Sequence, residues 1–262
     1  MHILVINLAE ARDRRQFQHQ QLQRLALEYE LVPATAAADI SAETWRQYSR
    51  DWQRPLKKTE VACYFSHRKA WNKVITIDAP ALILEDDACL SLCTPELLAA
   101  LNQRTHADLI TLEVRGRKKF VARNGEAIAC DSRLLRLYQD RTGAAGYILW
   151  PTGARKLLRH EQRHGISLAD AHITACHDLI AYQIEPAAII QLDQCHHYGL
   201  DRGDISALSS STISTTATNK GGARFRLRRI YHQVTLGLRQ LYLLSRSTRR
   251  FITLRKDDFH YE

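Results

Sequence analysis

No segment of the chain approaches the roughly 20 consecutive apolar residues that a bilayer-spanning helix requires. The first residues, MHILVINLAEARDRR, also lack the longer apolar core of a secretory signal. The six cysteines are scattered without a Cys-X-X-Cys pair, which disfavours a structural zinc site. Together these absences predict a cytoplasmic protein whose thiols are reduced.

Acidic residues are missing from a stretch near the end of the chain. Residues 220–256 contain 11 Lys and Arg but no Asp or Glu, whereas residues 1–219 contain 26 Lys and Arg against 25 Asp and Glu. The net charge of +9 therefore comes almost entirely from this basic end. A nearly neutral body, together with the absence of a recognition motif or aromatic platform, argues against nucleic acid as a partner.

Short apolar runs alternate with helix-forming segments through the first 191 residues. The opening, residues 3–33, follows a strand–helix–strand pattern that is typical of a βαβ unit with parallel strands. A helix is expected to begin at Thr59, as its N-cap, and another at Pro151. Further strands are expected over 81–87, 108–114, 144–150 and, interrupted by a turn, 179–191, with a hairpin over 118–138. This order predicts an α/β fold with a mostly parallel central sheet.

The composition changes after residue 205. Residues 206–219 hold 9 Ser and Thr in 14 positions, which predicts a loop or linker. We therefore expect a main domain over 1–205, a Ser/Thr-rich loop or linker over 206–219 and a basic amphipathic C-terminal segment over 220–262. Apolar residues of that segment recur at three- and four-residue spacings, which predicts a helical appendage with one apolar and one basic side. They are Leu227, Ile230, Tyr231, Val234, Leu238, Leu241 and Tyr242.

Three consecutive carboxylates, Glu85, Asp86 and Asp87, end the strand expected from residue 81. Along a strand, Glu85 and Asp87 face one way and Asp86 the other. Ligands of open α/β sheets bind beyond the carboxyl ends of strands, and crowded like charges are costly unless a cation neutralises them. The cluster therefore suits a hard divalent cation such as Mg²⁺ or Mn²⁺, with a solvated run that caps a helix as the alternative.

Four segments, taken together, resemble glycosyltransferase family 25, the lipooligosaccharide and lipopolysaccharide sugar transferases. In chain order they are INLAEARDRR, TEVACYFSH, LILEDD and TGAAGYILWPTGARKLL. The second is similar to the family's GEIGCFLSH, with two glycines replaced here and with Glu60, Cys63, Ser66 and His67 at matching positions. The resemblance covers roughly residues 2–190 and fades in the basic end.

This resemblance implies a GT-A-like nucleotide-sugar-binding fold and transfer with inversion from a UDP-sugar donor, often UDP-galactose. Glu85 and Asp87 would then hold Mn or Mg, which stabilises the charge of the nucleoside diphosphate leaving group. The candidates for contacts to uridine, ribose and phosphate are Asn7, Leu8, Arg14, His67 and Asp86. An exposed helix arginine is the ordinary alternative for Arg14, and a core histidine is the alternative for His67.

Inversion needs a general base that accepts the proton of the attacking hydroxyl. Asp170 is the best match to the family's base, although a surface helix cap is an equally ordinary role for it. Glu113, at the end of the strand expected over 108–114, is the reserve base. His196 and His197 follow the last expected strand, where GT-A enzymes commonly find a further metal ligand.

The family's acceptors are lipid-anchored sugars assembled on the cytoplasmic side, which implies a lipid-linked or oligosaccharide acceptor of the lipooligosaccharide or lipopolysaccharide type. The basic segment predicts peripheral attachment to anionic lipid on the inner face of the cytoplasmic membrane. The alternative is that its helix packs on the body with the basic side in water.

Two other classes stay open at this point. A non-catalytic sugar- or lipid-binding protein derived from a transferase would keep the fold without the reaction. A magnesium-dependent phosphotransfer domain also uses an acidic cluster, but a receiver places it after the first strand, which here ends at Asn7 and Leu8. Binding of UDP with manganese, followed by release of UDP in an assay, would separate a transferase from both.

Overall fold

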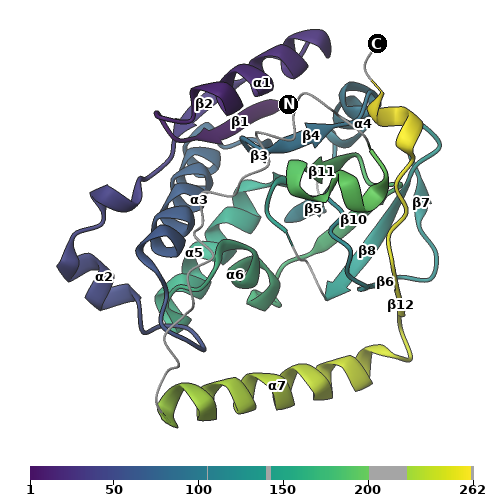
Figure 1. Ribbon diagram of the computed structural model, residues 1–262. Helices are drawn as coiled ribbons and strands as arrows, with labels where there is room; N and C mark the ends of the chain where they lie inside the picture. Colours follow the sequence, from purple (N-terminus) through teal and green to yellow (C-terminus); the bar gives the residue numbers. More distant parts are fainter. Residues whose placement is uncertain (105, 140–142, 201–222, 261–262) are drawn as a thin grey trace.

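A mixed sheet of ten strands forms the centre of the computed structural model, which describes residues 1–104, 106–139, 143–200 and 223–260 (Figure 1). Its strands are β1 (His2–Asn7), β2 (Glu30–Pro33), β3 (Ala81–Glu85), β5 (Leu109–Thr111), β6 (Lys119–Val121), β7 (Glu126–Ala127), β8 (Arg133–Gln139), β9 (Gly146–Leu149), β10 (Ala181–Glu185) and β12 (Thr248–Arg250). Their order is β12-β6-β8-β10-β5-β9-β3-β1-β2, and β7 pairs with β8. A second, two-stranded sheet is formed by β4 (Ala88–Leu90) and β11 (Ile189–Gln191).

The central strands β2, β1, β3, β5 and β10 share one direction. β1 is parallel to both β2 and β3, and β5 is parallel to β10. β9 lies between β3 and β5 and is antiparallel to both. The predicted α/β fold with a mostly parallel central sheet is confirmed, while the reversed strand in its middle is a feature that the sequence pattern does not indicate.

Helices cover both faces of this sheet (Figure 1). The helices of the body are α1 (Arg12–Arg24), α2 (Ala42–Tyr48), α3 (Lys58–Ile77), α4 (Thr94–Leu101), α5 (Pro151–His164) and α6 (Ala169–Ala175), and a further helix, α7 (Ala223–Leu243), follows them in the chain. Alternate residues of β1 show the two layers, because Leu4 and Ile6 join the core under α3 and α5, whereas Ile3 and Val5 join the core under α1 and α4. Among the described residues, no helix is both long and apolar enough to cross a membrane.

The start of α3 differs from the sequence prediction. Thr59 was expected as the N-cap, but the helix begins at Lys58 with Lys57 as its N-cap. The carboxylate of Glu60 accepts a hydrogen bond from the backbone N–H of Lys57 (2.8 Å) and two from Arg54 (2.6 and 2.8 Å). The Thr59 prediction is therefore wrong, because an acidic side chain three residues after the N-cap satisfies the free amide.

The basic segment expected over 220–262 is not one continuous helix. After α7, strand β12 pairs with β6 at the edge of the main sheet, and Phe259 is buried beside Cys89 and Ile190 of the two-stranded sheet. The expectation of a purely helical appendage is therefore wrong for residues 248–259, which belong to the body. The expected linker over 206–219, and the boundary after residue 205, lie outside the described residues.

Candidate active site

The carboxyl ends of β1 and β3 bring the first site residues together. The two strands are parallel, with Ile6 opposite Glu85, so Asn7 and Asp86 leave the sheet at the same edge. Asn7 Nδ2 donates to Asp86 Oδ2 (2.8 Å) and to the carbonyl of Ala11 (3.2 Å), which fixes the turn into α1. Residues 79 positions apart in the sequence are thereby joined at the end of the sheet.

Arg14 reaches the same point from the first turn of α1. Its guanidinium lies 3.0 Å from Asp86 Oδ1 and 3.8 Å from Asp87 Oδ2. Burial raises the pKa of Asp86 in spite of the opposing effects of Arg14 and Asn7. The structure thus groups Asn7, Arg14 and Asp86, while Leu8 contributes a backbone carbonyl that accepts the N–H of Ala11 (3.0 Å).

A chain of hydrogen bonds through the core ends at Glu85. Trp71 Nε1 donates to the hydroxyl of Tyr147 (2.8 Å), that hydroxyl lies 3.0 Å from His67 Nδ1, and His67 Nε2 lies 3.0 Å from Glu85 Oε1. An indole N–H only donates and an ionised carboxylate only accepts. The assignment that satisfies every group has Tyr147 donating to His67 and His67 donating to Glu85. His67, which is 1% exposed, therefore acts as a core residue that orients Glu85.

Glu85 and Asp87 converge on Gln191, at the end of β11. The Nε2 atom of Gln191 lies 3.0 Å from Glu85 Oε2 and 3.4 Å from Asp87 Oδ1, and its Oε1 atom accepts a hydrogen bond from Arg115. Two carboxylates that meet within 3.4 Å of one point fit the oxygen-rich shell of a divalent cation. Gln191 is a site residue that the sequence interpretation missed.

The charges of this pair support the same interpretation. Burial opposes ionisation of Glu85, but the hydrogen bond from His67 and the nearby charge of Arg115 hold its pKa below the ordinary value. Burial and the charge of Glu85 raise the pKa of Asp87 to about 7. Negative charge is therefore in excess around Asp87, and a bound cation would relieve it.

His196 and His197 lie in a short 3-10 helix, His196–Tyr198, and are exposed. In the part of the chain that the structure describes, neither forms an ion pair or hydrogen bond with Glu85 or Asp87. The ring of His197 packs edge-on against Tyr198 instead, with centroids 5.1 Å apart. The structure does not bring these histidines to the carboxylates, and their role as metal ligands stays a prediction.

A cysteine borders the site from α3. Within the described residues, the ligand atoms of Cys63, His67 and Glu85 lie within 4.8 Å of one another. Burial raises the pKa of Cys63 well above its ordinary value, and the charges of Glu85, Asp170 and Asp87 raise it further. The group is therefore a thiol beside a hydrogen-bonded His67–Glu85 pair.

The two candidate bases have different surroundings. Asp170 is half-buried in the first turn of α6 and accepts the N–H of Ala171 (2.7 Å). Glu113 is fully buried, and burial and the charge of Glu85 raise its pKa to about 8. Its Oε2 atom accepts the N–H of Ala145 (2.9 Å), and Oε1 has no partner among the described residues. A protonated and enclosed Glu113 is poorly placed to accept a proton from an incoming hydroxyl, which favours Asp170.

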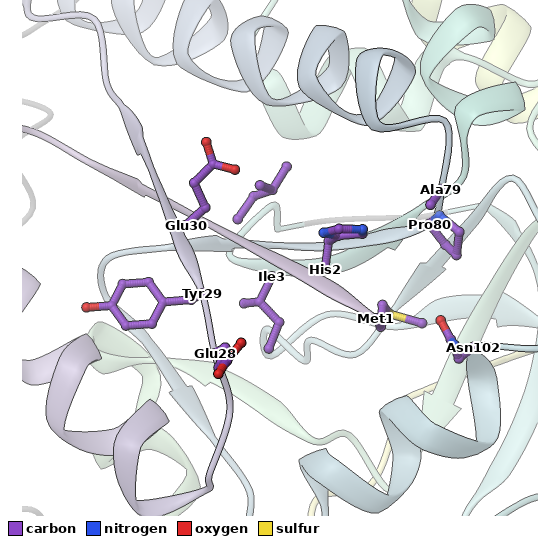
Figure 2. Close-up of a pocket in the computed structure, with 10 residues that line it drawn as sticks. Met1, His2, Ile3, Glu28, Tyr29, Glu30, Ala79, Pro80 and Asn102 are labelled. Carbon is purple, nitrogen blue, oxygen red and sulfur yellow. The ribbon is translucent and has the colours of Figure 1, made fainter.

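A hollow of about 530 Å³ lies away from the carboxylates of Glu85, Asp86 and Asp87 (Figure 2). It is lined by the beginning of β1, by Tyr29 and Glu30 near the beginning of β2, and by Pro80 before β3. These are the amino ends of parallel strands, at the edge of the sheet opposite to Glu85. Ligands of open α/β sheets bind at the carboxyl edge, so we place the site at the carboxylates rather than in this hollow.

The structure thus gathers carboxylates beside an arginine at the carboxyl edge of the sheet, where open α/β sheets bind their ligands. Comparison with known proteins gives the family. The model of glycosyltransferase family 25 (LPS biosynthesis protein) matches residues 1–173, and the chain belongs to this family. The resemblance found in the sequence is confirmed.

Two relatives show the range of the family. Procollagen galactosyltransferase 1-A of Xenopus laevis is 26% identical over 242 residues, which cover 80% of this chain but only 38% of the relative. Lipooligosaccharide biosynthesis protein lic2B of Haemophilus influenzae is 24% identical over 218 residues, which cover 75% of this chain and 78% of the relative. The chain thus spans about two fifths of the first protein and most of the second.

A solved structure, the inositol-1-phosphate CTP transferase from T. maritima, matches with a TM-score of 0.41 and 12% identity. The match covers 80% of this chain and 76% of that one.

Proposed function

We propose that the protein is a GT-A-type, metal-dependent, inverting glycosyltransferase. It moves a hexose, galactose from UDP-galactose, onto a glycan of the lipooligosaccharide or lipopolysaccharide type. Family membership and the names of the two relatives support the sugar and the acceptor. The observation that carries the proposal is the convergence of Glu85 and Asp87 on the amide of Gln191 at the carboxyl edge of the sheet.

Glu85 and Asp87 would hold Mn²⁺ or Mg²⁺, which when bound stabilises the charge of the departing UDP. The chain from Trp71 through Tyr147 and His67 keeps the carboxylate of Glu85 in one orientation. Such outer contacts commonly determine how well a ligand side chain binds its metal.

Asn7 and Arg14 hold the turn that carries Asp86 and Asp87. Arg14 also places a positive charge where the diphosphate of the donor would lie, so it assists leaving-group departure as well as packing. Asn7 marks the end of β1, where the uridine and ribose of the donor would enter. Its contacts to Asp86 keep both groups in place before the donor binds.

Asp170 serves as the general base. The acceptor oxygen forms its bond to the anomeric carbon as the bond to UDP breaks on the opposite face, and the hydroxyl proton passes to Asp170. This geometry inverts the configuration at the anomeric carbon. The half-buried position of Asp170 lets an acceptor reach it, which the enclosed Glu113 does not allow.

Release of UDP from UDP-galactose, in the presence of Mn²⁺ and a lipooligosaccharide acceptor, tests the proposal. Asp87→Asn should lower the rate by about 10²-fold or more, because it removes one of two charges that face the leaving group. Asp78→Asn is the matched control, since Asp78 precedes β3 at the opposite edge and has a left-handed conformation that asparagine tolerates. Wild-type rates in Asp87→Asn would refute the site.

A further inference from the structure

Helix α7 carries an apolar surface that its own chain leaves uncovered. Seven large side chains recur at three- and four-residue spacings and so lie on one face of the helix. Each is between 55% and 69% exposed, and together they are called the α7 stripe: Leu227, Ile230, Tyr231, Val234, Leu238, Leu241 and Tyr242. The expected alternative, in which these side chains pack on the body, does not occur among the described residues.

The helix is held to the body through other contacts. Leu243 is buried, and Arg239 donates a hydrogen bond to the carbonyl of Tyr138 (3.3 Å). The chain that follows enters the main sheet as β12. Figure 1 shows α7 lying along the outside of the molecule, away from the helices that cover the sheet. The stripe is therefore displayed from a helix whose C-terminal end is fixed.

The surroundings of the stripe are basic. Residues 220–256 contain 11 Lys and Arg and no acidic residue. Arg226 is exposed and lies one helical turn before Ile230, at the border of the stripe. Beyond the helix, the guanidinium of Arg246 lies 5.1 Å from the centre of the Tyr242 ring. Apolar side chains bordered by arginines form the surface that inserts at the boundary between headgroups and acyl chains of a bilayer.

We propose that the α7 stripe docks on the surface of an anionic phospholipid bilayer, with α7 in the plane of the interface and its arginines at the headgroup phosphates. A second copy of the chain is a poorer occupant, because stripe-to-stripe pairing would bring arginines together without acidic partners. A nucleic acid would leave the seven apolar side chains in water. Docking of this kind brings the site to an acceptor anchored in the same bilayer, yet it does not depend on the proposed reaction.

Co-sedimentation of the full chain with phosphatidylcholine vesicles, with and without phosphatidylglycerol, tests the proposal. The wild type should bind the anionic vesicles and be released as salt rises. Leu238→Glu with Leu241→Glu should abolish binding, and Arg226→Gln with Arg246→Gln should weaken it about 30-fold, at about 1 kcal/mol for each arginine. Substitutions are preferable to deletion of residues 220–262, which would also remove β12 and Phe259 from the body.

Matched controls make the same chemical changes elsewhere. Leu92→Glu adds an acid at a side chain that is 48% exposed outside α7, and Arg159→Gln with Arg163→Gln removes two exposed charges from α5. Both should bind like the wild type, and circular dichroism should show that all variants fold. Equal, salt-insensitive binding to neutral and anionic vesicles would overturn the proposal. The proposal would also be overturned if the wild type did not bind vesicles and instead formed a dimer that Leu238→Glu with Leu241→Glu converts to a monomer.

Discussion

Acid should destabilise this protein through His172, in the layer of side chains behind the site. The ring is 1% exposed and stacks on Trp71, with centroids 5.6 Å apart, and its Nε2 atom lies 3.1 Å from the carbonyl of Leu157. Burial lowers the pKa of His172 from 6.5 to about 4. His172 therefore binds a proton more weakly in the native state than in the unfolded chain.

The sign and size of the effect follow from these two values. As the pH falls below 6.5, the unfolded state binds a proton that the native state does not accept until about pH 4, so stability is lost over this interval. At about 1.4 kcal/mol per pH unit, the full loss is about 3 kcal/mol. Between about pH 7.5 and about pH 4.5, His172 should account for about 2–3 kcal/mol of the loss in the free energy of unfolding.

Urea unfolding of wild type and His172→Gln at both pH values measures this contribution. Glutamine keeps a donor for the carbonyl of Leu157 but does not titrate. Any change in the free energy of unfolding that comes from altered packing is the same at both pH values, so it cancels when each protein is compared with itself. The loss on acidification should be smaller in the variant by about 2–3 kcal/mol. His106→Gln, at an exposed position, should behave like the wild type. An equal loss in His172→Gln and wild type would refute this reasoning.

Two further pairs of substitutions test the packing of α5 on the sheet and the orientation of Glu85 in the site. Gly153→Ala should lower the free energy of unfolding, measured with urea, by about 1–3 kcal/mol, because its Cβ would lie 2.2 Å from a backbone carbonyl oxygen. Gly237→Ala is the control and should not lower it, because nothing lies within 4 Å of the added Cβ. His67→Phe should lower the affinity for Mn²⁺ by about 10- to 100-fold, because Glu85 loses the donor that orients it, whereas His67→Gln should restore part of that affinity. Unchanged Mn²⁺ affinity in His67→Phe would remove the positioning role.

The sequence predicts the elements of the site better than their pairing. The apolar run of β1 and the acidic end of β3 identify Asn7 and Asp86 separately, and the parallel sheet explains why they meet. Strand β9 was expected as a strand, but four apolar residues contain no information about direction. Its reversal between β3 and β5 is decided by the packing of the whole sheet.

Gln191 and Thr59 show where local patterns fail. A glutamine after an apolar run has no distinctive chemistry, and its contact with Glu85 spans 106 positions of sequence, so nothing local indicates it. Thr59 is a common type of N-cap, but Arg54 and the amide of Lys57 hold Glu60 in a competing arrangement. In both cases the deciding partner becomes apparent only once the chain is folded.

Calorimetric titration with UDP, first with Mn²⁺ present and then with the metal removed by a chelator, tests most directly whether Glu85 and Asp87 form a metal–nucleotide site. We expect UDP to bind with Mn²⁺, and chelation and Asp87→Asn each to weaken binding by at least about tenfold. Asp78→Asn should bind like the wild type. UDP affinity that neither chelation nor Asp87→Asn changes, or the absence of UDP binding with Mn²⁺ present, would contradict the assignment.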